Sequence, residues 1–407
     1  MSELVQLADI KDARERVASV IRRTPVDRLD SLSKVAGRPV LVKPEYRQRT
    51  GSFKIRGAYN FVSRLAPGLE VVAGSAGNHA QGVALAASMT GRPATIFMPI
   101  NAPLPKVDAT RAYGATVRLE GTVVDESLDA ARAYAAESGA VYVPPFDDPL
   151  VIAGQGTIGL ELAEEAPDAE VVVVPIGGGG LIAGVAAALA HTRRRIRVIG
   201  VEAEGAAAMR ASLDQGRRVT LDHVSTMADG IAPKSCSDLT IAHVQAYVDD
   251  VVTVTEEEIS RAVLLCLERG KGVVEPAGAV SLAAILSDRI PGRGRGGARG
   301  DAVALLSGGN VDPLLLVKLI HYGLTVAGRF LMLRVMLPDH PGSLAELTRT
   351  IADLRVNVID VEHHRAGLTL GPNEVSVLVT METRDATHRG EVVAALAQAG
   401  FRVELVG

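Results

Sequence analysis

Residues 171–180 read VVVVPIGGGG, and this stretch decides the fold class of the chain. Four consecutive valines predict a fully buried β-strand, and the glycine run predicts a tight turn into the apolar helix expected at residues 181–190. Free backbone N–H groups and the helix dipole at such a junction favour a bound phosphate. The glycine spacing matches neither the P-loop nor the dinucleotide fingerprint, so a nucleotide is not indicated.

The same alternation of short apolar segments and helical segments extends through the first 325 residues. Strands are expected at residues 40–42, 71–73, 94–98, 116–119, 196–201 and 302–306, and a helix is expected at residues 80–89. Short apolar strands that alternate with helices predict an α/β domain built on buried parallel sheets.

The order of elements changes beyond a boundary near residues 325–329. Expected strands at 330–337, 356–364, 374–380 and 401–406, with helices at 343–354 and 387–398, follow the β-α-β-β-α-β order of a ferredoxin-like fold. We therefore predict a first domain over residues 1–325, with a small subdomain inserted at about 50–150, and a second domain over residues 326–407.

Composition and charge exclude several classes of function. The net charge of −4 over 407 residues, with no tryptophan, offers no electrostatic or stacking surface for nucleic acid. No apolar run approaches membrane-spanning length. The two cysteines, Cys236 and Cys266, lie far apart without metal-type spacing, which predicts reduced thiols in a cytoplasmic protein.

Residues 50–58 (TGSFKIRGA) contain the candidate nucleophile, Lys54. A lysine flanked by glycine, small polar residues and an aromatic suits a buried amine that binds an aldehyde. Burial lowers a lysine pKa and makes the neutral amine available. Together with the glycine-rich turns, Lys54 predicts an enzyme that carries pyridoxal 5'-phosphate as a Schiff base.

Two further loops follow expected strands. Residues 75–79 (SAGNH) place Ser75 and Asn78 before a helix, where they either bind a substrate carboxylate and a phenolate oxygen or cap the helix. Residues 307–310 (SGGN) follow a strand, so Ser307 is expected at the crevice in which open α/β sheets bind ligands.

These motifs give the chain a close resemblance to the fold-type II pyridoxal-phosphate enzymes, most closely the threonine dehydratase and serine racemase group. The matching segments occur in the family's order over roughly residues 15–320 and comprise residues 51–58, 75–81, 174–180, 228–230, 275–279 and 307–310. The resemblance implies a tryptophan synthase β-like catalytic domain with two parallel-sheet subdomains.

The resemblance also implies a role for each matching residue. Lys54 would hold the cofactor and act as the base at the substrate Cα, and Glu275 would lie near the ring or the substrate hydroxyl. The other implied cofactor contacts are Phe53, Asn78 at the ring oxygen, Gly177, Gly178, Gly179, Gly180 and Leu181 at the phosphate, and Ser307 at the pyridine nitrogen. The implied substrate-carboxylate loop is Ser75, Ala76, Gly77, Asn78 and His79.

The implied reaction is β-elimination that converts L-threonine to 2-oxobutyrate and ammonia, with some conversion of L-serine to pyruvate. A neutral serine at the pyridine nitrogen makes the ring a weaker electron sink, which favours rapid loss of the β-hydroxyl. Racemases of this group carry serine where Ala76 stands, so racemisation should be poor. The alternatives are a serine dehydratase or racemase, a β-replacement enzyme, or a catalytically dead amino-acid-binding regulator.

Metal and effector sites complete the expectations. Glu202 matches one ligand of the racemase-type cation site, but Ala208 replaces the other, so no divalent metal is expected. A monovalent cation held by backbone carbonyls is the alternative at this position. Residues 337–344 (LPDHPGSL) resemble the effector loop of ACT domains, which implies a branched-chain amino-acid effector, or else a purely structural dimerisation domain. The implied effector residues are Asp339, His340, Pro341, Gly342, Ser343, Leu344 and Asn357. A homodimer or homotetramer in isoleucine synthesis or threonine breakdown is expected by analogy.

Overall fold

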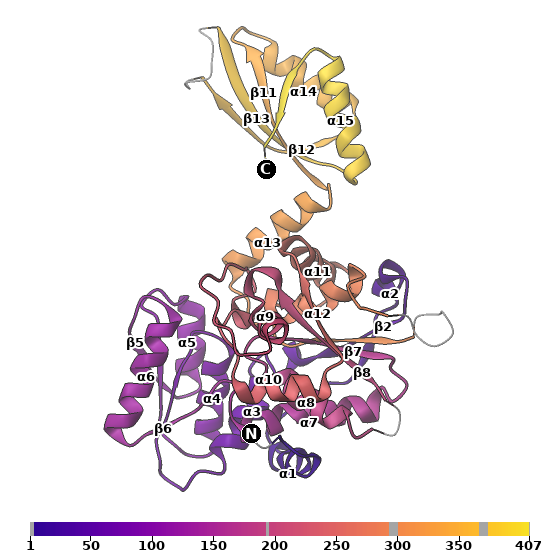
Figure 1. The fold of residues 1–407 in the computed structure, drawn as a ribbon. Helices are drawn as coiled ribbons and strands as arrows, with labels where there is room; N and C mark the ends of the chain where they lie inside the picture. Colours follow the sequence, from indigo (N-terminus) through magenta and orange to yellow (C-terminus); the bar gives the residue numbers. More distant parts are fainter. Residues whose placement is uncertain (1–3, 193–194, 293–299, 366–372, 407) are drawn as a thin grey trace. The chain divides into compact units, whose positions relative to one another are not determined.

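The computed structural model describes residues 4–192, 195–292, 300–365 and 373–406 (Figure 1). Contacts between residues divide the chain into two units, Met1–Pro313 and Leu314–Gly407. Helix α13 (Pro313–Val326) lies almost wholly in the second unit, whereas the sequence-based boundary at residues 325–326, which stays a prediction, assigned it to the first.

The larger sheet of the first unit has the strand order β1-β2-β10-β7-β8-β9. Its strands are β1 (Asp27–Arg28), β2 (Val40–Pro44), β7 (Val171–Pro175), β8 (Arg197–Ala203), β9 (Asp250–Val254) and β10 (Ala302–Leu306). All neighbours are parallel except β1, which pairs antiparallel with β2. The valines of β7 are fully buried because a central parallel strand is covered on both faces.

Helices cover both faces of this sheet (Figure 1). One face carries α1 (Leu7–Val17), α7 (Pro149–Glu165), α8 (Gly180–Leu189) and α10 (Asp238–Tyr247), and the other carries α2 (Asp30–Ala36), α11 (Glu256–Glu268) and α12 (Pro276–Leu286). Short elements complete this part: η1 (Glu45–Arg47), η2 (Glu204–Ala206), α9 (Ala208–Gln215) and η3 (Asp229–Ile231).

The smaller sheet of the first unit is parallel throughout, in the order β5-β4-β3-β6. Its strands are β3 (Val71–Gly74), β4 (Ala94–Met98), β5 (Thr116–Leu119) and β6 (Val141–Tyr142). The helices around it are α3 (Lys54–Val62), α4 (Asn78–Met89), α5 (Leu104–Ala112) and α6 (Val124–Ser138). The small side chains of α4 allow α3 and α4 to pack closely in a shared core.

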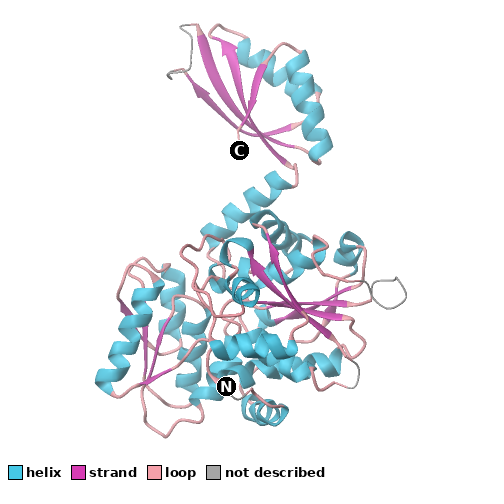
Figure 2. Ribbon diagram, in the orientation of Figure 1, coloured by secondary structure: helices cyan, strands magenta, loops and turns pink. Residues whose placement is uncertain are grey.

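The second unit contains a four-stranded antiparallel sheet in the order β12-β13-β11-β14 (Figure 2). Its elements after α13 are β11 (Phe330–Pro338), α14 (Ser343–Asp353), β12 (Asn357–His364), β13 (Glu374–Glu382), α15 (Ala386–Gln398) and β14 (Arg402–Leu405). Alternate residues of β11 are buried, as a sheet with one covered face requires. The predicted β-α-β-β-α-β order is confirmed.

The strands and helices expected from the sequence all occur, with small shifts at their ends. The sequence reading missed the two-residue strands β1 and β6 and the mixed-polarity strand β9. Within the described ranges, every helix is too short or too polar to cross a lipid bilayer.

Candidate active site

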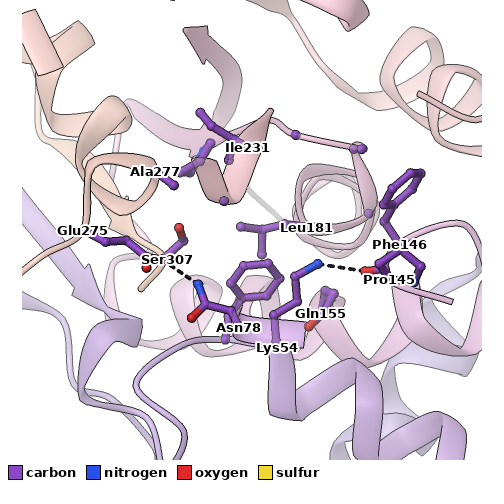
Figure 3. Close-up of a pocket in the computed structure, with 17 residues that line it drawn as sticks. Lys54, Asn78, Pro145, Phe146, Gln155, Leu181, Ile231, Glu275, Ala277 and Ser307 are labelled. Atoms are coloured by element: carbon purple, nitrogen blue, oxygen red, sulfur yellow. Dashed lines mark hydrogen bonds between the residues drawn. The ribbon is translucent and has the colours of Figure 1, made fainter. Parts of the chain in front are cut away.

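A pocket in the first unit brings together most of the residues that the sequence singled out (Figure 3). It encloses about 500 Å³ of atom-free space, part of it open to solvent. The predicted residues in its lining are Phe53, Lys54, Asn78, Gly177, Gly178, Gly179, Gly180, Leu181, Glu275 and Ser307. Pro175, Gly230 and Ala277, from three of the matching segments, also line it without having been assigned a role. The sequence analysis missed Pro145, Phe146, Gln155 and Ile231.

Lys54 is the first residue of α3 and is partly buried, with its ammonium group in the pocket. Its Nζ donates a hydrogen bond to the backbone carbonyl of Pro145 at 2.8 Å. Burial lowers the pKa of Lys54 to about 8, although the charges of Asp147 and Glu275 favour the ammonium. An appreciable fraction of the amine is therefore neutral, and nucleophilic, near neutral pH.

Backbone pairing between two distant loops fixes Lys54 beside Ser307. Ser52 forms an isolated antiparallel bridge with Gly308, and the N–H of Phe53 donates to the carbonyl of Ser307 at 3.1 Å. Ser307 is only 4% exposed and follows the carboxyl end of β10 in the pocket wall. The loop before Lys54 and the loop that begins at Ser307 are thus held together by their backbones.

The glycine turn lies between β7 and α8, as the sequence predicted. Gly179 has a φ of 92°, and a Cβ at Gly178 would lie 2.2 Å from the Phe146 ring. No hydrogen bond between described residues uses the backbone N–H of Gly178, Gly179 or Gly180. Such unpaired N–H groups at a helix N-terminus fit the phosphate of pyridoxal 5'-phosphate.

Asn78 and Glu275 are hydrogen-bonded to each other in the pocket lining. Asn78 Nδ2 donates to Glu275 Oε1 at 2.6 Å (Figure 3). Burial raises the pKa of Glu275 to about 7, and the hydrogen bond from Asn78 partly counteracts this rise. Glu275 is the N-cap residue of α12, so the backbone of a helix end holds its position.

Of the predicted substrate-carboxylate loop, the structure places Asn78 in the pocket lining. Ser75, Ala76, Gly77 and His79 are absent from the lining as far as the described residues define it, so their role stays a prediction. The ring of His79 bonds through Nε2 to the carbonyl of Val143 at 2.9 Å. Burial and the charge of Lys54 lower the pKa of His79 to about 3, so this ring is neutral.

Glu202 lies outside the pocket lining and caps α9. Its two oxygens accept the N–H groups of Met209 and Arg210, each at 2.8 Å. Burial raises the pKa of Glu202 to about 7. Among the described residues, no group of three or more His, Cys, Asp or Glu side chains is arranged to hold a metal ion.

The predicted effector residues lie where β11 leads into α14, apart from Asn357, which begins β12. Gly342 caps α14 with a φ of 104°, and the Ser343 hydroxyl bonds to His340 Nδ1 at 3.1 Å. Arg365 forms an ion pair with Asp339 at 3.4 Å. This loop offers a helix N-terminus, which suits a carboxylate ligand.

Comparison with known proteins places these features in a family context. Residues 17–308 match the family of pyridoxal-phosphate dependent enzymes, and residues 331–401 match the ACT domain. The chain is 45% identical to the L-threonine ammonia-lyase of Thermotoga maritima over 99% of this chain and 100% of that protein. It resembles the solved threonine deaminase isoform 2 of Solanum lycopersicum (39% identity, TM-score 0.72, 78% of this chain, 86% of that one). It also resembles maize serine racemase (36% identity, TM-score 0.73, 79% of this chain, 99% of that one).

Proposed function

The chain belongs to the pyridoxal-phosphate-dependent enzymes, and we propose that within this family it is a threonine ammonia-lyase. It would convert L-threonine to 2-oxobutyrate and ammonia, and L-serine more slowly to pyruvate. The observation that carries the proposal is Lys54, an amine with a pKa of about 8 in a pocket that also contains the glycine turn and Ser307. The full-length Thermotoga relative bears the name of the same activity.

The residues present fit pyridoxal 5'-phosphate, which supplies an electron sink for bond breaking at the substrate Cα when it is bound. Lys54 would hold the cofactor's aldehyde carbon, and the free N–H groups from Gly177 to Leu181 would hold its phosphate. Ser307 would face the pyridine nitrogen and Asn78 the ring oxygen. Each of these groups lines the pocket, which supports the assignment.

Lys54 would also move the Cα proton once substrate has taken its place on the cofactor, because a free amine with a pKa near 8 is a competent base at neutral pH. Ser307 presents a neutral hydroxyl, which does not hold a proton on the pyridine nitrogen as a carboxylate would. This weaker polarisation favours loss of the β-hydroxyl over return of the proton to Cα. The residue choice therefore supports elimination.

Racemisation on the same scaffold is the second candidate, since maize serine racemase is a structural neighbour. A racemase needs a second proton donor on the face opposite Lys54. Ala76 has no proton to exchange at the position implied for that donor. We therefore expect little D-serine from L-serine, and chiral chromatography of the reaction mixture measures it.

The deciding experiment is 2-oxo acid formation by the purified, cofactor-loaded protein with L-threonine and L-serine in parallel. We expect 2-oxobutyrate to form faster than pyruvate, and Lys54→Ala to abolish both products. A cofactor-loaded protein that forms no oxo acid from either substrate would overturn the proposal. Such a result would instead favour β-replacement or racemisation as the reaction.

The C-terminal unit contains an ACT domain, and we propose that it binds a branched-chain amino acid that regulates the enzyme. The helix N-terminus at Gly342, with Ser343 and His340, supports binding of the effector's carboxylate. We also propose a cytoplasmic homodimer or homotetramer. Rates with added isoleucine or valine, and the mass from light scattering, test these statements; a monomer whose rate neither amino acid changes would contradict them.

A further inference from the structure

A series of side-chain hydrogen bonds leads from Asn310 to Asn78 and Glu275, two residues of the pocket lining. Asn310 Nδ2 donates to Asn78 Oδ1 at 2.7 Å, and Asn78 Nδ2 donates to Glu275 Oε1 at 2.6 Å. Asn310 Nδ2 also donates to the backbone carbonyl of Thr50 at 2.7 Å. Both protons of the Asn310 amide nitrogen are therefore used.

The Thr50 carbonyl determines which atoms donate and which accept in this series of hydrogen bonds. A carbonyl oxygen can only accept, so the NH2 group of Asn310 must face Thr50 and, with it, Asn78. Asn78 must then present its oxygen to Asn310 and its NH2 group to Glu275. A flipped Asn78 would oppose two NH2 groups at the Asn310 end, and that hydrogen bond would be lost. At the other end its oxygen would face the Glu275 carboxylate whenever Glu275 is ionised.

Two glycines lie against the hydrogen-bonded side chains and leave them little room to move. Gly51 has a φ of 70°, and a Cβ there would lie 2.3 Å from Asn310 Oδ1. A Cβ at Gly308 would lie 2.1 Å from Glu275 Oε1 and 3.0 Å from Asn78 Nδ2. These glycines belong to the two loops that pair beside Lys54, so the same backbone that fixes the nucleophile also confines the amide chain.

We infer that Asn310 is a positioning residue that sets the orientation of the Asn78 amide toward the cofactor. In this orientation one N–H of Asn78 Nδ2 donates a hydrogen bond to Glu275. The other N–H is available to donate to the ring oxygen of pyridoxal 5'-phosphate. The inference rests on the cofactor assignment made under the proposed function. Asn310 is absent from the pocket lining as far as the described residues define it, so it would act on the cofactor through Asn78.

A double-mutant cycle on cofactor binding tests this inference. Apoenzyme with Asn310→Ala, Asn78→Ala or both is titrated with pyridoxal 5'-phosphate, and absorbance gives the affinity and the band position. We expect each single variant to bind roughly tenfold more weakly, with the same band shift, and the double variant to match Asn78→Ala. Losses of affinity that add up in the double variant, or an unshifted cofactor absorbance band in Asn310→Ala, would overturn the inference.

Asn310→Asp provides a second test should the alanine variant fold poorly. Aspartate keeps the shape of the side chain but has no proton for Thr50 or Asn78, so it should reproduce the weaker binding and the band shift. Wild-type affinity and band position in Asn310→Asp would refute the positioning role. The backbone N–H of Asn310, which also bonds to Glu275, is the same in every variant.

Asn60→Ala is the matched control. Asn60 is a fully buried asparagine of α3 whose Nδ2 donates to the carbonyl of Leu150 at 2.7 Å, outside the pocket lining. Its loss should lower the unfolding temperature without moving the cofactor band. The test is also separate from that of the activity, because a wild-type protein that binds cofactor but forms no oxo acid would refute only the proposed reaction.

Discussion

Replacing Arg56 by methionine is expected to lower the free energy of unfolding by about 3–5 kcal/mol. Arg56 is fully buried and donates to Glu45 through Nε at 2.9 Å and through Nη2 at 2.8 Å. It also donates to Glu161, at 2.6 Å from Nη1 and at 3.0 Å from Nη2. Methionine removes the cation and leaves Lys43, at 2.7 Å from Glu161, as the remaining buried positive charge that contacts this pair.

The effect should depend on pH with a defined sign. Burial raises the pKa of Glu45, but Arg56 outweighs it and holds the pKa below its usual value. In the wild type, Glu45 therefore contributes stability above its unfolded pKa of about 4.5, and this is lost as the pH falls through the lower folded value. Without Arg56, burial dominates and the folded pKa rises, so the variant should regain stability as the pH falls toward 4.5.

Urea unfolding at pH 5 and pH 8, followed by far-UV circular dichroism because the chain has no tryptophan, measures both effects. Arg14→Met is the control: its ion pair with Glu164 is about half exposed, so its loss should change stability by at most about 1 kcal/mol. A loss below 1 kcal/mol for Arg56→Met, or a larger loss at pH 5 than at pH 8, would refute the reasoning.

Two further predictions concern the pocket. Gly178→Ala should weaken binding of pyridoxal 5'-phosphate about 10- to 100-fold in an apoenzyme titration, because the added Cβ would lie 2.2 Å from the Phe146 ring. Gly390→Ala, which meets no atom within 4 Å, should leave the affinity unchanged; equal affinities would contradict the packing argument. Labelling of Lys54 in the apoenzyme by an aldehyde and borohydride, followed by peptide mass spectrometry, should reach half its maximal rate near pH 8. Glu275→Gln should lower that midpoint because it removes a charge that favours the ammonium, and a midpoint near 10.5 would show that burial has no effect.

The strands, the glycine turn and the candidate nucleophile could be predicted from the sequence because their signals are local. Four valines followed by glycines identify β7 and its turn without knowledge of any partner. By contrast, Phe146 and Gln155 enter the pocket only because α7 and the loop before it fold back toward α3. No local pattern distinguishes them from ordinary loop and core residues, and the three-dimensional contacts alone reveal their role.

Lys54 and Arg56 show how one helix separates anchoring from chemistry. They lie two residues apart on α3, and at 3.6 residues per turn their side chains point roughly 200° apart. Burial lowers the pKa of both, but Glu45 and Glu161 hold the pKa of Arg56 above its usual value, whereas Lys54 donates its hydrogen bond to a neutral carbonyl. The face with paired charges fixes the helix in the core. The opposite face can then keep a desolvated, nucleophilic amine that a flexible surface lysine would not provide.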